Sequence, residues 1–272
     1  MDRFELYECC VQSPRHVVNF LRAAHGEEPL VLREDFCGTA AVSRRWAADG
    51  QKRGDDARAL GVDLDEGALA RAREMAVGVD EHRLRLARGD CFKGGVPSGD
   101  EGADVIFVGN FSLGYISRRR ELMGYLRASL GRLARGNCGF GGGIFVCDTY
   151  GGAGAYRLGA IQRRHTGPRG EVVHYLWRHD AADPMTATVE NSISFRVERD
   201  GEVVGEMADA FRYRWRLWTI AELREAMEEA GFASTEVHVD VNLAPGERAR
   251  PVEDAGRLGE DWSVLIVGRT GV

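Results

Sequence analysis

The chain has 272 residues, of which 44% are hydrophobic and 29% charged, and it carries a formal net charge of −6 at pH 7. This composition is typical of a globular protein with one large α/β domain or one domain with a sizeable insertion. No apolar run approaches the roughly 18 residues of a membrane span, and the acidic start lacks the apolar core of a signal peptide, so we expect a cytoplasmic protein without a membrane partner. The acidic net charge argues against binding to a phosphate backbone, so we expect no nucleic-acid partner.

Residues 1–28 are expected to form an N-terminal helical cap. Ser13-Pro14 has the pattern of a helix N-cap followed by a first-turn proline, which predicts a short helix, a break and a helix over 14–25. Two of the six cysteines, Cys9 and Cys10, lie in this part. None of the six forms a C-x-x-C pair or stands at ligand spacing from histidine, so we expect reduced thiols and no metal site.

Residues 29–149 alternate between short apolar runs and helical segments. A regular alternation of this kind predicts an open parallel sheet with helices on both faces. The expected strands are 29–34, 59–63, 83–87, 103–108 and 144–148, the expected helices are 40–49, 65–76 and 118–134, and the expected loops are 50–57 and 136–143.

Residues 150–218 show a different pattern, with longer alternating strands over 172–178, 186–199 and 202–218. The hairpin signal Asp200-Gly201 indicates antiparallel pairing. In the last strand Phe211, Tyr213, Trp215 and Leu217 share one face, which is expected to pack, and three arginines share the other. An upstream basic cluster is expected to flank a mobile loop, with an anionic acceptor as the alternative; it comprises Arg157, Arg163, Arg164, His165 and Arg169.

Residues 219–272 return to the first pattern and complete a sheet of about seven strands. Thr219 and Glu222 form a capping box, and Gly231 marks the end of a helix over 219–230. Two strands, 234–241 and 262–268, follow.

The turn after the first strand carries most of the chemistry. It leads through Cys37-Gly38-Thr39 into a helix, so backbone N–H groups and a helix N-terminus converge on a point that a ligand can approach over glycine. The fingerprint G-x-G-x-x-G of dinucleotide-binding proteins is absent. The acid Glu34 before the turn suits a cationic amino group better than a phosphate.

Two further strands also end at acids. Asp63 can accept the two hydroxyls of a ribose, and Asp90 can accept from an exocyclic amine such as that of adenine. Because the carboxyl ends of parallel strands share one edge of the sheet, the three acids are expected along one ligand-binding edge. Amino acid, ribose and adenine together describe S-adenosylmethionine (SAM).

The sequence resembles the class I SAM-dependent methyltransferases. The residues that carry the resemblance are Val31-Leu32-Arg33-Glu34-Asp35-Phe36-Cys37-Gly38-Thr39-Ala40, Gly61-Val62-Asp63-Leu64-Asp65, Gly89-Asp90-Cys91 and Gly109-Asn110-Phe111-Ser112-Leu113-Gly114-Tyr115. The resemblance covers about 30–148, with the last helix and strands in matching order, and extends loosely to Leu6-Tyr7-Glu8 and Val11-Gln12-Ser13-Pro14. Phe36 and Ala40 stand where the family usually has glycine, which leaves the path of the turn open.

The resemblance implies a Rossmann-like, mostly parallel seven-stranded sheet in which the antiparallel insertion acts as a lid. It implies SAM as cofactor, S-adenosylhomocysteine (SAH) as product, and methyl transfer to N or O, less readily S or C, of a small molecule. The oligomeric state stays open, and a homodimer is one of the alternatives. The implied cofactor-binding residues are Tyr7, Gln12, Arg15, Glu34, Phe36, Cys37, Gly38, Thr39, Asp63, Leu64, Asp90, Cys91, Asn110, Phe111 and Ser112. Candidates to orient the acceptor are Tyr7, Asn110, Tyr115 and His174.

Plainer interpretations stay open for several of these residues. Glu34 and Asp63 could cap the helices that follow them, Asp90 could be a turn residue, and Tyr7 could serve only in packing. Two other functions also stay open: a methyltransferase acting on RNA or protein, and a nucleotide-binding protein without methyl transfer, such as an NAD-dependent oxidoreductase or a SAM-binding regulator.

Overall fold

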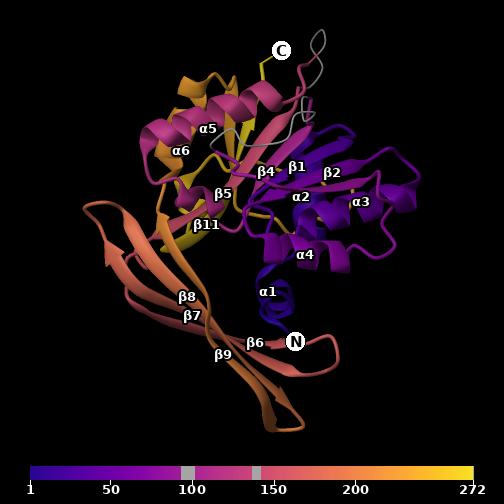
Figure 1. Ribbon diagram of the computed structural model, residues 1–272. Helices are drawn as coiled ribbons and strands as arrows, with labels where there is room; N and C mark the ends of the chain where they lie inside the picture. Colours follow the sequence, from indigo (N-terminus) through magenta and orange to yellow (C-terminus); the bar gives the residue numbers. More distant parts are fainter. Residues whose placement is uncertain (93–101, 137–141, 272) are drawn as a thin grey trace.

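A seven-stranded sheet forms the centre of this computed structural model, which describes residues 1–92, 102–136 and 142–271 (Figure 1). The strand order is β10-β11-β5-β4-β1-β2-β3. The strands are β1 (Val31–Asp35), β2 (Arg58–Asp63), β3 (Leu84–Arg88), β4 (Val105–Val108), β5 (Ile144–Gly152), β10 (Ser234–His238) and β11 (Asp261–Arg269).

Parallel pairing places the ends of the central strands side by side. Leu32 of β1 is level with Ala59 of β2 and with Val105 of β4, and β11 is antiparallel to both of its neighbours. Strand β2 lies on one side of β1 and strand β4 on the other, so the order of the strands reverses at β1. Ligands of open α/β sheets bind at such a reversal point, outside the carboxyl ends of the strands.

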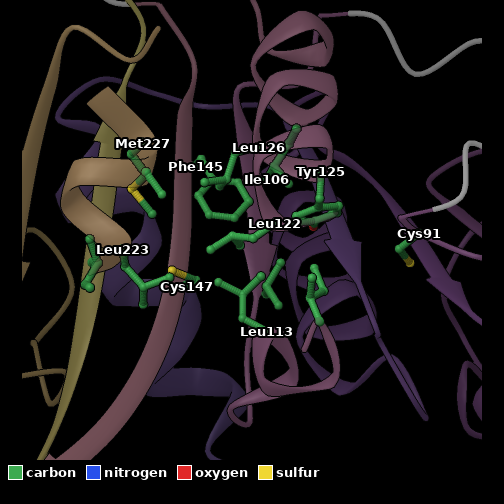
Figure 2. Close-up of a cluster of buried hydrophobic side chains, with 14 of the residues drawn as sticks. Cys91, Ile106, Leu113, Leu122, Tyr125, Leu126, Phe145, Cys147, Leu223 and Met227 are labelled. Atoms are coloured by element: carbon green, nitrogen blue, oxygen red, sulfur yellow. The ribbon is translucent and has the colours of Figure 1, made fainter. Parts of the chain in front are cut away.

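Helices cover both faces of this sheet, as expected. On one face α2 (Pro14–His25) and α3 (Ala41–Arg53) bury Phe20, Leu21 and Trp46 against the sheet. On the other, α5 (Arg119–Arg132) and α6 (Ile220–Ala230) pack against strands β4 and β5 (Figure 2). The buried side chains drawn there include Leu122, Leu126, Leu223, Met227, Ile106 and Phe145. The remaining α-helices are α1 (Arg3–Val11) and α4 (Glu66–Met75), and the 3-10 helices are η1 (Ser112–Tyr115) and η2 (Ala255–Arg257).

A second sheet, of four antiparallel strands in the order β6-β7-β8-β9, lies between β5 and α6 in the chain. Helix α1 lies between it and the larger sheet (Figure 1). The face toward α1, here the inner face, carries Val173, Tyr175 and Ile193 in one buried cluster with Leu6. The strands are β6 (Gly159–Thr166), β7 (Val172–Asp183), β8 (Thr188–Arg199) and β9 (Glu202–Arg216).

The expected elements are present, and the bounds of several of them differ from the expected ones. Helix α3 continues to Arg53, through part of the expected loop 50–57. Strand β5 continues to Gly152, beyond the expected start of the insertion at residue 150. The basic cluster expected to flank a loop instead contributes Arg163, Arg164 and His165 to strand β6. Residues 137–141 of the expected glycine-rich loop lie outside the described part of the chain.

No helix within the described ranges is both long and apolar enough to cross a membrane.

Candidate functional site

The turn between β1 and α3 contains only one glycine, Gly38, but three of its residues adopt the left-handed conformation that favours glycine. Phe36, Gly38 and Ala40 have φ values of 56°, 54° and 53°. Left-handed residues at alternate positions bring successive backbone N–H groups toward one concave point. A Cβ atom added to Gly38 would meet nothing within 4 Å, so the space in front of the turn is open.

Packing holds the two left-handed residues that are not glycine. Each costs roughly 1–2 kcal/mol relative to a right-handed conformation. Ala40 is fully buried beside Cys37 and Leu69. The Phe36 ring lies 6.1 Å from that of Phe92 and 6.3 Å from that of Tyr115, at interplanar angles of 25° and 23°. The turn is therefore kept in this conformation by side-chain contacts.

Glu34 caps helix α3 from the preceding strand. Its Oε2 accepts hydrogen bonds from the backbone N–H and the hydroxyl of Ser43, at 2.8 and 2.6 Å. The N-cap residue Ala40 has no side chain that could accept these donors. Burial raises the pKa of Glu34 to about 7, against the lowering effect of the Ser43 hydrogen bonds. Glu34 therefore caps helix α3, as the plainer interpretation of this residue predicted. A contact between Glu34 and the amino group of a ligand stays a prediction.

Asp63 ties the end of β2 to the turn. One carboxylate oxygen accepts from the Gly38 N–H at 2.7 Å and the other from the Asp65 N–H at 2.8 Å. Desolvation raises the pKa of Asp63. A carboxylate oxygen can accept two hydrogen bonds, so capacity remains for a ligand. The neighbouring Leu64 is an apolar side chain that is 54% exposed.

The third and fourth strands contribute to the same edge of the sheet. After β3, Asp90 accepts from the Phe92 N–H at 3.3 Å, and Cys91 is buried. After β4, Asn110 and Phe111 are both left-handed, with φ values of 56° and 59°. The Phe111 N–H donates to Asp148 Oδ1, in the middle of β5, at 2.6 Å. Ser112 follows, buried, with its N–H bonded to the Gly109 carbonyl at 3.2 Å.

Helix α1 forms a wall beside the turn. Glu8 accepts from the Thr39 hydroxyl and pairs with Arg44 of α3, the latter at 2.5 Å. A hydrogen bond joins the Tyr7 and Tyr213 hydroxyls, and the Tyr7 ring lies 4.9 Å from Phe211 of β9. The helix therefore connects the turn with the second sheet.

Gln12 and Arg15 lie further along this segment. Gln12 is the C-cap residue of α1, and no described residue partners its buried Oε1. Arg15 is exposed in the first turn of α2. A contact of Arg15 with the cofactor stays a prediction.

Aromatic rings line the space between the turn and the second sheet. Tyr115 lies 6.0 Å from Trp215, and Trp215 stacks on Tyr213 at 4.4 Å. Phe111 lies 4.6 Å from Tyr150 and 6.1 Å from Trp215. The alternating aromatic face of β9 predicted from the sequence is thus the inner face of the second sheet.

His174 was expected to orient the acceptor, and the structure corrects this. Its neighbours Val173 and Tyr175 fill the inner face, so His174 lies on the outer face, 3.0 Å from Glu198. The register places it beside Arg164 and Arg196, also away from the turn. Successive residues of a strand point to opposite faces, so His174 cannot share a site with Tyr175.

Three residues of this region were missed from the sequence. Asp148 ends the apolar run 144–148 as Asp63 ends the run 59–63, and the same sequence signal could have identified it. Glu8 lies within the quoted N-terminal segment but was not assigned a role, and Tyr213 was assigned only to packing. The described residues contain no group of three or more histidine, cysteine or acidic side chains able to hold a metal ion.

Known structures share this architecture over nearly the whole chain. A SAM-dependent methyltransferase from Clostridium acetobutylicum ATCC 824 matches with a TM-score of 0.67 at 18% identity, over 99% of this chain and 98% of that one. The chain has the fold of SAM-dependent methyltransferases. The CcbJ methyltransferase from Streptomyces caelestis matches with a TM-score of 0.64 at 22% identity, over 95% and 90% of the two chains.

CalS10 from Micromonospora echinaspora, an amino pentose methyltransferase, has the same fold, with a TM-score of 0.64 at 17% identity over 97% and 94% of the two chains. No protein-family model matches the sequence, and no curated protein matches it. The methyltransferase fold is therefore established by structure.

Proposed function

We propose that this protein is a SAM-dependent methyltransferase acting on a small molecule. The observation that carries the proposal is the turn at residues 36–40, with its three alternating left-handed residues and open front, hydrogen-bonded through Gly38 to Asp63 of the next strand. The similar structures support the same function, since their names include a sugar N-methyltransferase, KedS8, and a glycopeptide N-methyltransferase, MtfA.

The residues fit the parts of SAM in the order of the strands. The turn and the start of α3 offer N–H groups to the amino-acid part, with Glu34 behind them. Asp63 offers its remaining lone pairs to the ribose hydroxyls. Leu64, Asp90 and Cys91 surround the place for adenine, where the exposed Leu64 side chain would gain an apolar partner.

The sulfonium of bound SAM supplies an activated methyl group, so the protein needs mainly to align the acceptor and exclude water. Asn110, Phe111 and Ser112 follow β4, between the turn and Asp148. Tyr7, Tyr115 and the aromatic residues of β9 enclose this space from the side of α1 and the second sheet. We assign the second sheet the role of a lid over the acceptor.

A dinucleotide fits this site less well. Glu34 lies behind the turn and Glu8 bonds Thr39 within it, so carboxylates stand where a pyrophosphate would place its charge. Like charges at such a distance repel, and a pyrophosphate site normally offers only donors.

Calorimetry with SAH tests the assignment of Asp63. Asp63→Asn should weaken SAH binding about tenfold or more, because a charged acceptor of two hydroxyls is lost. Asp65→Asn is the matched control: this exposed residue caps α4 with the same carboxylate chemistry, and asparagine caps equally well. Equal SAH affinity in the wild type and in Asp63→Asn would show that Asp63 is not part of the site.

A further inference from the structure

Asp148 of β5 is a fourth acid near the ligand-binding edge of the sheet: it lies one residue beyond the level at which β4 ends, while β5 itself continues to Gly152. Cys147 is level with Val108 of β4, and Val108 with Asp35 of β1, so Asp148 lies level with the start of the turn. Ile144 and Val146 pack on the α2 and α3 side of the sheet, as does Leu32. Alternation along a strand therefore puts Asp148 on the same face as Glu34.

The position of β5 sets Asp148 apart from the other acids. Along the edge come Asp90 of β3, Asp63 of β2, the turn after β1, Asn110 after β4, and then Asp148. The proposed cofactor site uses the first four strand ends. Asp148 of β5 is next in this order. Burial raises the pKa of Tyr7, and the negative charge of Asp148 adds to that shift.

The contacts of Asp148 leave part of its carboxylate available. Oδ1 accepts from the Phe111 N–H at 2.6 Å. This bond holds one of the two left-handed residues of the loop. The side chain is nevertheless partly exposed, and a carboxylate can accept about four hydrogen bonds.

The surroundings of the Asp148 carboxylate are apolar and aromatic. Within the described ranges no arginine, lysine or histidine forms an ion pair with it, and the rings of Phe111 and Tyr150 lie next to each other beside it. Burial raises the pKa of Asp148 to about 7. A carboxylate without a cationic partner, among aromatic rings, favours a cationic ligand.

We propose that Asp148 binds the cationic amine of the methyl acceptor and takes the proton that this amine must lose before methylation. The inference rests on the proposed function and narrows it, because it makes the acceptor a primary or secondary amine and not an alcohol. Tyr7, Phe111 and Tyr150 supply the aromatic surroundings of the ammonium group.

The proton and electron balance is complete within this site. The ammonium donates one proton to the Asp148 carboxylate and becomes a neutral amine with a free lone pair. That lone pair forms the new N–C bond to the methyl carbon while the C–S bond breaks, and its electron pair remains on sulfur as SAH forms. The methylated product leaves as an ammonium ion, and the Asp148 proton passes to water.

Sinefungin tests this inference without knowledge of the acceptor. It carries an amine where SAM carries the methyl sulfonium, so its ammonium would lie beside Asp148, whereas SAH has no charge there. Asp148→Asn keeps an acceptor for the Phe111 N–H and removes the charge. It should weaken sinefungin binding about tenfold in calorimetry and change SAH binding less than about twofold.

Glu190→Gln is the control for net charge, because Glu190 lies exposed on the outer face of β8, beside Arg214. It should change neither affinity. If Asp148→Asn weakens both ligands equally, Asp148 only supports the loop, and if it weakens neither, Asp148 is outside the site; either result overturns the inference. Asp148→Ser provides the same comparison if the asparagine variant fails to fold. If wild type binds neither ligand, the proposed function itself fails.

Discussion

Glu34 shows how a single buried side chain supports the shape of the turn. A helix that begins at a left-handed alanine lacks the serine, threonine or aspartate that usually satisfies its first N–H groups. Glu34 replaces that cap from the strand, at the cost of burying a carboxylate. The same residue thus links the folding of α3 to the ligand-binding turn.

The raised pKa of Glu34 predicts a pH dependence of stability. The folded pKa, about 7, lies above the ordinary value of 4.5, so the folded state binds more protons than the unfolded state between these pH values. Stability of the ligand-free protein should therefore fall as the pH rises from about 4.5 to 7. Thermal melts of Glu34→Gln, which stays neutral and can still accept from Ser43, should lose this part of the dependence. An identical pH profile in the variant would contradict the assignment.

At the scale of single residues, the sequence predicts which acidic residues lie at the edge of the sheet better than it predicts the face of a strand toward which a side chain points. Glu34, Asp63 and Asp90 lie on one edge because parallel strands end together. His174 was misassigned because apolar and polar residues mix on both faces of β7, where Val172 and Leu176 alternate with Val173 and Tyr175. Which face packs was decided by α1, a contact distant in the sequence.

Helix α1 is the element that connects the proposed cofactor site to the second sheet. Glu8 holds it to the turn and to Arg44, and Arg71 of α4 pairs with Glu5 at 2.5 Å and with Asp2 at 3.2 Å. Tyr7 contacts β9 on the opposite side. Charge pairs on the side of the turn, and the apolar packing of Leu6 against the second sheet, keep this helix in place.

Removing one of these links should affect ligand binding more than folding. Glu8→Gln breaks a partly buried pair beside the turn, so SAH should bind roughly threefold to tenfold more weakly and dissociate faster in stopped-flow measurements. Glu66→Gln, which breaks an exposed pair with Arg73 on α4, should leave SAH binding unchanged. SAH kinetics that are the same in Glu8→Gln and wild type would show that α1 is not a wall of the site.

Elements with a clear apolar pattern were predicted well, and those without one were missed. In β6 every residue except His165 is exposed, so hydrogen bonds to β7 and not burial define this strand. The polar end of α3 continues because Gly50 lets the helix approach Ala57, whose Cβ would lie 2.4 Å from an added Cβ. Neither cause is visible in the periodicity of the sequence.

On the scale of the whole molecule, topology explains why one edge can hold a cofactor and its acceptor. The reversal of strand order at β1 opens the edge, and the second sheet and α1 flank it (Figure 1). The seven-stranded sheet was predictable because each strand and helix follows in alternation. The spatial relation of the second sheet to the turn was not, since it depends on the contacts of α1.

Calorimetric titration of the wild-type protein with SAH, and separately with NADH, tests the central claim most directly. The account predicts saturable binding of SAH at one site per chain and no binding of NADH, because the turn offers N–H groups backed by carboxylates and lacks a pyrophosphate cradle. Binding of NADH without binding of SAH would contradict it.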